Sequence, residues 1–436
     1  MRLVLFDGPP EVRSRFHPLS LSRPIWQLRC GMTSLGEKLI ARVGATDVAC
    51  WVPEYMAAAC RETTDMPVND PATLSGDDLL LLSSRVKAEG FEAAVGGRSE
   101  VGVNEAGDVL YARLAAGDLD KLAASGAAGR SPCDFGNFMS KARDVLPTVT
   151  TSAATYEYVW DLVLETPEQI TSDFAAAGRT GIEGTVEEPH AIRGGRKDVY
   201  VAPGAVVHPM VVIDAENGPV YLDEEVEVHP FTRIEGPCYV GRKSVLLGAK
   251  CREGNSIGPV CRIGGEIEES VIQGHSNKYH DGFLGHAYVG EWVNLGAMTT
   301  NSDLKNDYGS VSVIMDGRNP IDTGSNKVGS MIGDHTKTSI GVLFNTGAYV
   351  GAMALIMATG KPLPKFIPSF AWFLEGAVTK GFGRKKLYQT AEVAMGRRNR
   401  QWTEAQEAMW EAVYEMTAPA RRDALKKGRK ALLRDK

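Results

Sequence analysis

The sequence predicts an α/β domain over residues 1–190, a three-sided parallel β-helix over 191–360, and a cap with a helical tail over 361–436. Strand-like and helix-like segments alternate in the first part, and aliphatic residues recur every six positions in the second. Apolar residues return at helical spacing after Leu387. The 436 residues are 43% hydrophobic and 23% charged, which is typical of a globular protein with two or three domains.

The first part contains short apolar runs that predict strands. These are Arg2 to Phe6, Val48 to Val52 and Leu79 to Leu82. Amphipathic stretches from Ser34 to Val43 and from Glu157 to Leu164 predict helices. This alternation favours a mixed α/β domain.

In the middle part, one register of six runs unbroken through Leu222, Val228, Ile234, Val240 and Leu246. Further runs at the same spacing are Val201, Val207 and Ile213; Ile257 and Ile263; Phe283, Val289 and Leu295; and Ile332, Thr338, Phe344, Val350 and Ile356. A period of six fits neither a helix nor an alternating strand, but it fits short strands joined by tight turns into a triangular coil with these residues inside. The alternative is chance recurrence in a valine- and glycine-rich β-sandwich.

Composition excludes several classes of protein. The seven cysteines are scattered without a CxxC pair, so neither a disulfide framework nor a zinc ribbon is indicated. The apolar run Leu3 to Phe6 is too short for a signal peptide or a membrane span. A net charge of −6 argues against a nucleic-acid partner. We therefore expect a cytoplasmic protein with no membrane or nucleic-acid partner.

Two other segments have a distinctive composition. Ala115 to Gly129 is rich in Ala and Gly and fits a helical insertion or a mobile segment. The tail from Arg384 holds 14 Lys or Arg against 7 Asp or Glu. The simpler interpretation of the tail is a solvated amphipathic helix, and a binding site for the CoA phosphates is the alternative.

A dense cluster of polar residues interrupts the apolar register between residues 273 and 307. It contains His275, His280, His286 and the segment from Asn301 to Asp307. A solenoid needs apolar residues to stack, so polar groups at this density are unfavourable unless a site uses them. The pattern predicts a functional site here.

Within this cluster, HDGFLGHAYVGEWVNLGA, His280 to Ala297, resembles the acetyltransferase half of the bifunctional sugar-1-phosphate nucleotidylyltransferase/acetyltransferase family. The resemblance implies a left-handed β-helix, a homotrimer and acetyl-CoA as co-substrate. It also implies that His280 is the catalytic base, that Asn294 contacts the amino sugar, and that the backbone amide of Ala297 stabilises the oxyanion.

The resemblance continues through TTNSDLKND, Thr299 to Asp307, through Asn326 to Gly329, and through IGDHTKTSIG, Ile332 to Gly341. It implies that Asp303 and Lys337 contact acyl-CoA. On the sugar side the residues that it implies are Lys327, Lys278 and Phe283. Two departures put an identical sugar-phosphate geometry in doubt: Phe283 replaces a Tyr of the family, and Glu268, with Glu266 beside it, replaces a phosphate-binding Lys.

The chemistry assigned to His280 also follows from its residue type. An amine that attacks a thioester must lose a proton, and an imidazole can accept a proton near neutral pH. Direct transfer in a ternary complex needs no acyl-enzyme.

The segment RFHPLSLSRP, Arg15 to Pro24, resembles the start of a divergent sugar nucleotidyltransferase domain. The resemblance implies UTP and Mg²⁺ as ligands if this half is active. The expected glycine-rich loop is replaced by Asp7-Gly8-Pro9-Pro10, and proline donates no amide hydrogen. We expect Arg13 and Arg15 to replace those backbone donors and Arg23 to replace a family Lys. Asp7 and Asp161 are the magnesium candidates.

The leading hypothesis is a bifunctional enzyme that acetylates an amino-sugar 1-phosphate and transfers a nucleotide to it, giving UDP-N-acetylglucosamine or a related product. One alternative is an acyltransferase with an inactive N-terminal domain. A second is a metalloenzyme resembling γ-class carbonic anhydrases, in which His275 and His280 are metal ligands and His229 fits poorly as the third. A third is a non-catalytic scaffold.

Overall fold

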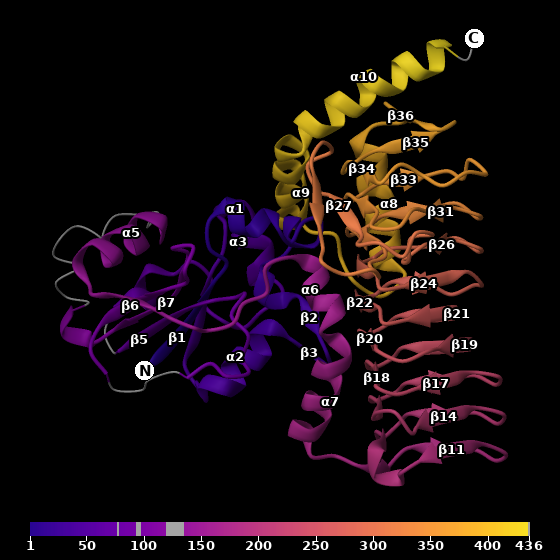
Figure 1. The fold of residues 1–436 in the computed structure, drawn as a ribbon, viewed down its shortest axis with the longest axis horizontal. Coiled ribbons are helices and arrows are strands. Elements are labelled where there is room, and N and C mark those ends of the chain that lie inside the picture. Colours follow the sequence, from indigo (N-terminus) through magenta and orange to yellow (C-terminus); the bar gives the residue numbers. More distant parts are fainter. Residues whose placement is uncertain (76–77, 93–96, 119–134, 435–436) are drawn as a thin grey trace.

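The computed structural model describes residues 1–75, 78–92, 97–118 and 135–434 (Figure 1). The expected fold class is confirmed: an α/β domain, a left-handed parallel β-helix and C-terminal helices follow one another along the chain. Residues 119–129 of the Ala- and Gly-rich stretch lie outside the described residues. Among the described helices, none has the length and apolar character needed to cross a membrane.

The N-terminal domain is built on a six-stranded sheet of order β4-β1-β5-β7-β6-β8. The strands are β1 (Arg2–Phe6), β4 (Val48–Trp51), β5 (Leu79–Ser83), β6 (Glu100–Val103), β7 (Val109–Leu114) and β8 (Thr148–Thr150). The first three are parallel to one another and match the predicted strands. The helices around them are α1 (Pro10–Ser14), α2 (Leu35–Val43), α3 (Glu54–Arg61), α5 (Phe135–Val145), α6 (Val159–Leu164) and α7 (Thr166–Ala177).

The β-helix starts at Gly181, ten residues before the boundary expected at 191. Its first face is a ten-stranded parallel sheet. The strands of this face are β9 (Gly181–Ile182), β12 (Val199–Val201), β15 (Val220–Leu222), β18 (Cys238–Val240), β20 (Asn255–Ile257), β22 (Val271–Gly274), β25 (Tyr288–Glu291), β29 (Met331–Ile332), β32 (Tyr349–Val350) and β34 (Phe366–Ile367).

The edge between the other two faces is called the 2–3 edge below, and the seven-residue strands β19 and β21 run across it. The second face is formed by β10 (Thr185–Val186), β13 (Val206–Val207), β16 (Glu227–Val228), β19 (Val245–Cys251), β21 (Arg262–Glu268), β23 (Asn277–Lys278), β30 (Lys337–Thr338), β33 (Leu355–Ile356) and β35 (Trp372–Leu374). The third is formed by β11 (Ala191–Gly194), β14 (Val212–Ala215), β17 (Arg233–Glu235), the ends of β19 and β21, β24 (Phe283–Gly285), β26 (Thr300–Asn301) and β31 (Leu343–Phe344). A hairpin of β27 (Ser312–Ile314) and β28 (Pro320–Asp322) projects between β26 and β29.

The aliphatic residues of the six-residue register fill the centre of the coil, and this part of the prediction is confirmed. Phe283 is the exception, because Leu284 points into the core in its place while Phe283 is only half-buried. The inward positions continue from Ile272 through Lys278 to Leu284 at intervals of six, but Val289 lies only five positions after Leu284, so the register shifts by one here. Tight stacking explains the glycine that often follows an inward residue: a Cβ on Gly258 would lie 2.1 Å from the carbonyl oxygen of Gln273.

Three helices follow the last coil: α8 (Arg384–Gly396), α9 (Glu404–Met416) and α10 (Ala418–Arg434). They were expected from the helical spacing after Leu387. Helix α9 packs against α3 of the N-terminal domain, and α10 packs against β36 (Ala377–Thr379) at the end of the coil. The N-terminal domain lies beside the middle of the β-helix, with α6 and α7 against its first face (Figure 1).

Candidate active sites

A cavity of about 1010 Å³ opens at the carboxyl ends of β1, β4 and β5 in the N-terminal domain. Its lining includes Asp7, Trp51, Tyr55, Asp108 and Phe135. In open α/β sheets, ligands bind in the crevice at the carboxyl ends of parallel strands. Its size and its aromatic walls suit a nucleotide.

The three arginines expected to bind nucleotide are in different places. Arg13 lines the cavity, with its Nε 3.4 Å from Asp7 Oδ2. Arg15 forms an ion pair with Glu157 at 2.5 Å and is not part of the lining. Arg23 lies at the junction with the β-helix, as described below. Two arginines not expected from the sequence, Arg85 and Arg143, also line the cavity.

Asp7 and Asp161 do not fit a shared magnesium ion. Asp7 accepts a hydrogen bond from the Ile25 backbone N–H at 3.0 Å, and burial raises the pKa of Asp7 although Arg13 is close. Asp161 accepts hydrogen bonds from the backbone N–H groups of Glu157 and Tyr158, at 2.7 and 2.8 Å. These bonds cap the start of α6. Asp161 is not among the residues that line the cavity. Since both carboxylates accept hydrogen bonds within the fold, they do not fit a magnesium site.

The second site lies on the 2–3 edge of the β-helix, where His280 sits in the turn between β23 and β24. Its side chain is exposed, and its nearest ring neighbour is Tyr279, with centroids 5.8 Å apart. Lys278 is buried beneath this turn and donates hydrogen bonds to the carbonyl oxygens of His280 and, at 3.3 Å, of Gly264. Burial lowers the pKa of Lys278 to about 8. Lys278 therefore holds the turn that presents His280, a role that its sequence position did not indicate.

The next coil brings Ala297 to the same edge. The N–H of Met298 donates to the Asp281 carbonyl oxygen at 2.8 Å, and the Ala297 carbonyl oxygen accepts from Gly341 N–H at 2.8 Å. No acceptor among the described residues is recorded for the N–H of Ala297 itself. Among the described residues, the stacking of these coils therefore leaves the Ala297 N–H without an acceptor, one coil after the turn that holds His280.

Asn294 is exposed on the second face, three residues before Ala297. Its Oδ1 accepts a hydrogen bond from Asn277 Nδ2 at 3.1 Å. Lys337 pairs with Asn294 in the following coil, and its Nζ donates to the carbonyl oxygens of Trp292 and, at 3.2 Å, of His335. Burial lowers the pKa of Lys337 to about 8. Lys337 is therefore occupied by the turns around it.

The other expected residues belong to a charged cluster on the third face, which we call the Glu268 cluster. Its members are Arg252, Glu268, Glu269, His286, Asp303 and Lys327. Glu268 is buried between Arg252 at 2.6 Å and Lys327 at 3.2 Å. His286 lies between Asp303 at 2.8 Å and Glu269 at 3.2 Å. Lys327 and Asp303 are therefore engaged within the protein, and Glu268 is neutralised by two cations.

Phe283 lies between His280 and the Glu268 cluster. It starts β24, three residues after His280, and its backbone N–H donates to Thr300 Oγ1 at 3.1 Å. A Cβ on Gly285 would lie 2.4 Å from the Phe283 ring and 2.4 Å from Asp303 Oδ2. The ring and the carboxylate therefore meet over Gly285, and only glycine leaves room for both.

The Glu268 cluster makes stability depend on pH. Burial alone would lower the pKa of His286, but its hydrogen bonds to Asp303 and Glu269 outweigh burial and raise it to about 9. The contribution of the protonated ring is therefore complete below the unfolded value of about 6.5 and is lost as pH rises through about 9. We expect the difference in unfolding free energy between wild type and His286→Gln to shrink by up to about 3 kcal/mol over this range.

Chemical denaturation at pH 6 and pH 9.5 measures this difference. Comparing the two proteins removes contributions from other titrating groups, such as Lys278 and Lys337, that both proteins share. A difference that stays constant with pH would contradict the assignment.

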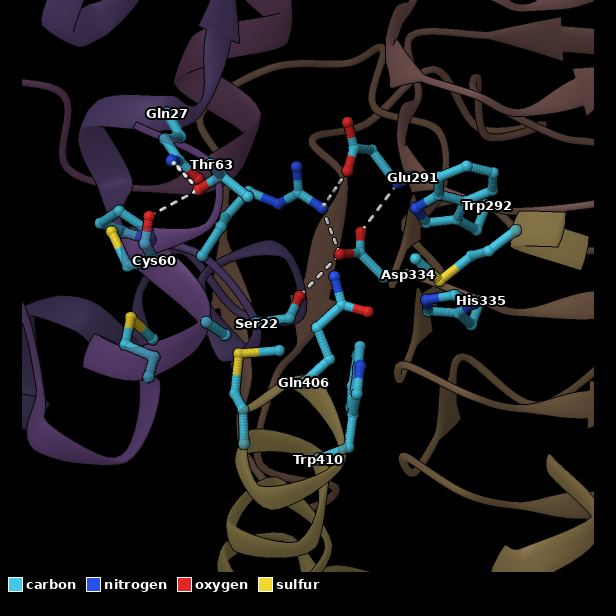
Figure 2. Close-up of a pocket in the computed structure, with 16 residues that line it drawn as sticks. Ser22, Gln27, Cys60, Thr63, Glu291, Trp292, Asp334, His335, Gln406 and Trp410 are labelled. Carbon is cyan, nitrogen blue, oxygen red and sulfur yellow. Dashed lines mark hydrogen bonds and ion pairs between the residues drawn. The ribbon is translucent and has the colours of Figure 1, made fainter. Parts of the chain in front are cut away.

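The N-terminal domain and the β-helix are joined by a buried ionic contact (Figure 2). The guanidinium of Arg23 forms ion pairs with Asp334 and, at 3.4 Å, with Glu291. Asp334 Oδ2 also accepts from Ser22 Oγ at 2.6 Å, and its Oδ1 accepts from the Glu291 backbone N–H at 2.8 Å. These groups border a cavity of about 80 Å³ closed by α9 through Gln406 and Trp410. Arg23 thus links two domains and is not in the nucleotide cavity.

The histidines expected for a carbonic-anhydrase-like site do not lie close enough together to share a metal ion. His275 stacks on Trp292, with ring centroids 4.4 Å apart, while His280 is exposed on the 2–3 edge. Among the described residues, two groups of three place potential ligand atoms within 4.8 Å of one another. They are His208, Glu227 and His229, and Glu268, Glu269 and His286. Neither contains His275 or His280. The first group was not predicted from the sequence. A repeated His-Pro pair, at His208 and at His229 21 residues later, is the sequence feature that could have indicated it.

Comparison with known proteins agrees with this architecture. The sequence profile of the family described as sugar nucleotidyl transferase matches residues 3–180. The chain is 34% identical over 150 residues to a bifunctional sugar-1-phosphate nucleotidylyltransferase/acetyltransferase of Sulfurisphaera tokodaii, covering 32% of this chain and 35% of that protein.

Two proteins named bifunctional protein GlmU are also similar. The one from Polaromonas naphthalenivorans is 34% identical over 113 residues, covering 26% of this chain and 21% of its own length. The one from Thermotoga petrophila is 27% identical over 177 residues, covering 36% of each chain. The chain therefore aligns with about a third or less of each relative's length.

A solved structure of Francisella novicida UDP-N-acetylglucosamine acyltransferase covers 52% of this chain and 90% of its own, at 12% identity and a TM-score of 0.30. The chain is thus similar to sugar nucleotidyl transferases over residues 3–180, and to bifunctional sugar-1-phosphate nucleotidylyltransferase/acetyltransferases over about a third of its length.

Proposed function

We propose that the β-helix transfers the acetyl group of acetyl-CoA to the amine of an amino-sugar 1-phosphate, with His280 as general base. The observation that carries this proposal is the pairing of an exposed imidazole with a free backbone N–H, that of Ala297, on one edge in successive coils. A general base typically raises the reaction rate by about 10²- to 10⁴-fold, and a hydrogen-bond donor to the oxyanion raises it by a comparable factor.

In this mechanism the ring nitrogen of His280 removes the proton as the sugar amine attacks the thioester carbon. The N–H of Ala297 donates to the carbonyl oxygen as it gains negative charge. The C–S bond then breaks, and CoA leaves as the thiol after taking up a proton. Asn294, exposed beside Ala297, is available to hydrogen-bond the sugar.

The 2–3 edge also supports the homotrimer that the resemblance implies. Six large apolar side chains are exposed along it: Met210, Phe231, Leu247, Met298, Ile340 and Met357. Large apolar side chains that are exposed along one edge are typical of a contact surface. We infer that a second copy covers these side chains and closes a groove over His280 for the pantetheine arm. Light scattering that gives the mass of a single chain would exclude the trimer.

The cavity of the N-terminal domain supports nucleotidyl transfer as a second activity, from UTP to a sugar 1-phosphate. Two of its arginines are neutralised, Arg13 by Asp7 and Arg85 by Asp108 at 2.6 Å. Arg143 lines the same cavity, and no carboxylate partner is recorded for it among the described residues. Its charge is therefore available to a triphosphate.

Replacing Arg143 with alanine is expected to weaken UTP binding by about tenfold, because a charge-assisted contact contributes about 1.5 kcal/mol or more. Isothermal titration measures the affinity, and Arg318→Ala, an exposed arginine on the β-helix hairpin, is the control. Equal affinities for Arg143→Ala and wild type would count against phosphate binding in this cavity.

The two activities are separated by two assays. CoA release is measured with acetyl-CoA and glucosamine 1-phosphate, and pyrophosphate release with UTP and N-acetylglucosamine 1-phosphate. We expect CoA release in the first. A protein without activity in either assay across several sugar phosphates would overturn the proposal.

A further inference from the structure

A histidine and carboxylate cluster lies on the 2–3 edge, several coils before His280. Val207 pairs with Val228 in adjacent parallel strands, so the residues that follow, His208 and His229, occupy the same position in successive coils. Glu187 holds this position one coil earlier, because Val186 pairs with Val207. The fold therefore stacks two imidazoles and a carboxylate in a column at the spacing of a parallel sheet, about 4.8 Å.

Glu227 brings the two imidazoles to a common point. Its Oε1 lies 3.2 Å from His208 Nε2 and 3.4 Å from His229 Nε2. These separations are longer than the usual N–H···O hydrogen bond of about 2.9 Å. They match the edge of a tetrahedron with metal–ligand bonds of about 2.0 to 2.1 Å, which is about 3.3 to 3.4 Å.

The other ring nitrogen of His208 has a separate partner. His208 Nδ1 lies 3.0 Å from Glu187 Oε2, at normal hydrogen-bond length. A histidine that binds a metal through one nitrogen typically donates its other N–H to a carboxylate, which fixes the tautomer and the ring orientation. Glu187 occupies this position for His208.

We propose that His208, His229 and Glu227 form a binding site for a divalent transition-metal ion such as Zn²⁺, with Glu187 as a positioning residue. Two imidazole nitrogens and one carboxylate oxygen are ligands that suit Zn²⁺. All four side chains are partly exposed, so the fourth coordination position is open to water. Bound metal would tie two coils of the β-helix together. This inference is independent of the acetyl-transfer site.

The test uses the full-length chain without an affinity tag, treated with a chelator and then titrated with Zn²⁺. Calorimetry and metal analysis after dialysis are expected to give one Zn²⁺ per chain. His208→Gln and His229→Gln should each reduce the affinity by more than the 10- to 100-fold expected for Glu187→Gln, which removes only an outer contact. His190→Gln, a change at a neighbouring histidine outside the cluster, should leave the affinity unchanged.

Circular dichroism shows whether each variant is folded, and thermal unfolding supplies a second measurement. Zn²⁺ should raise the unfolding temperature of wild type and of His190→Gln but not of His208→Gln, because a ligand that binds only the folded state stabilises it. The proposal is overturned if wild type binds no stoichiometric Zn²⁺, or if the His208 and His229 variants bind it as tightly as wild type.

Discussion

Replacing His280 with alanine is expected to lower the rate of CoA release by about 100- to 10,000-fold, because the incoming amine loses its general base. The side chain is exposed and no hydrogen bond of its ring is recorded among the described residues, so the fold should be unchanged. Steady-state assays with acetyl-CoA and glucosamine 1-phosphate measure the loss.

Asp281→Asn is the matched control, because Asp281 is the next residue of the same exposed turn. Its backbone carbonyl, which accepts from Met298 N–H, is kept in this variant. We expect the control to retain activity close to that of wild type. If His280→Ala also kept its activity within a few-fold, His280 would not be the base.

Replacing Asp334 with alanine is expected to destabilise the protein by about 3 to 5 kcal/mol, because it leaves the buried Arg23 guanidinium without its closest carboxylate. Both side chains are at most 7% exposed, so water cannot replace the lost partner. Chemical denaturation followed by tryptophan fluorescence measures the change, since Trp292 and Trp410 line the adjacent cavity.

An exposed ion pair provides the comparison. Arg318 and Asp423 lie 2.7 Å apart, with side chains 73% and 43% exposed. Exposed pairs contribute at most about 1 kcal/mol, so Asp423→Ala should have little effect. If Asp334→Ala cost no more than Asp423→Ala, the contact between Arg23 and Asp334 would not hold the two domains together.

Much of the fold follows from the sequence because each coil repeats one requirement, an aliphatic residue directed inward every six positions. Leu222, Val228 and Ile234 meet it and are fully buried. The register was wrong only at Phe283, because the inward residues Leu284 and Val289 are five positions apart instead of six. A six-residue count cannot detect one shortened interval when an apolar residue stands at both of the positions it could select.

The candidate sites were harder to predict, because their partners are distant in the chain. The sequence motif identified His280 and Ala297, which fall on one edge in adjacent coils. It could not show that Lys327 meets Glu268, or that Arg23 contacts Asp334, which is 311 residues away. A motif match assigns a role to a residue from its type and its place in the sequence. The ion-pair partner of a buried charged residue, in contrast, depends on which residues the tertiary fold brings next to it.

A structure of the protein with bound acetyl-CoA would show where the thioester lies relative to His280 and Ala297. We expect the thioester on the 2–3 edge, with its carbonyl oxygen within hydrogen-bond distance of the Ala297 N–H and its carbonyl carbon facing the imidazole of His280. Acetyl-CoA bound on another face of the β-helix, with the Ala297 N–H and the His280 ring both free of it, would contradict acetyl transfer at this edge.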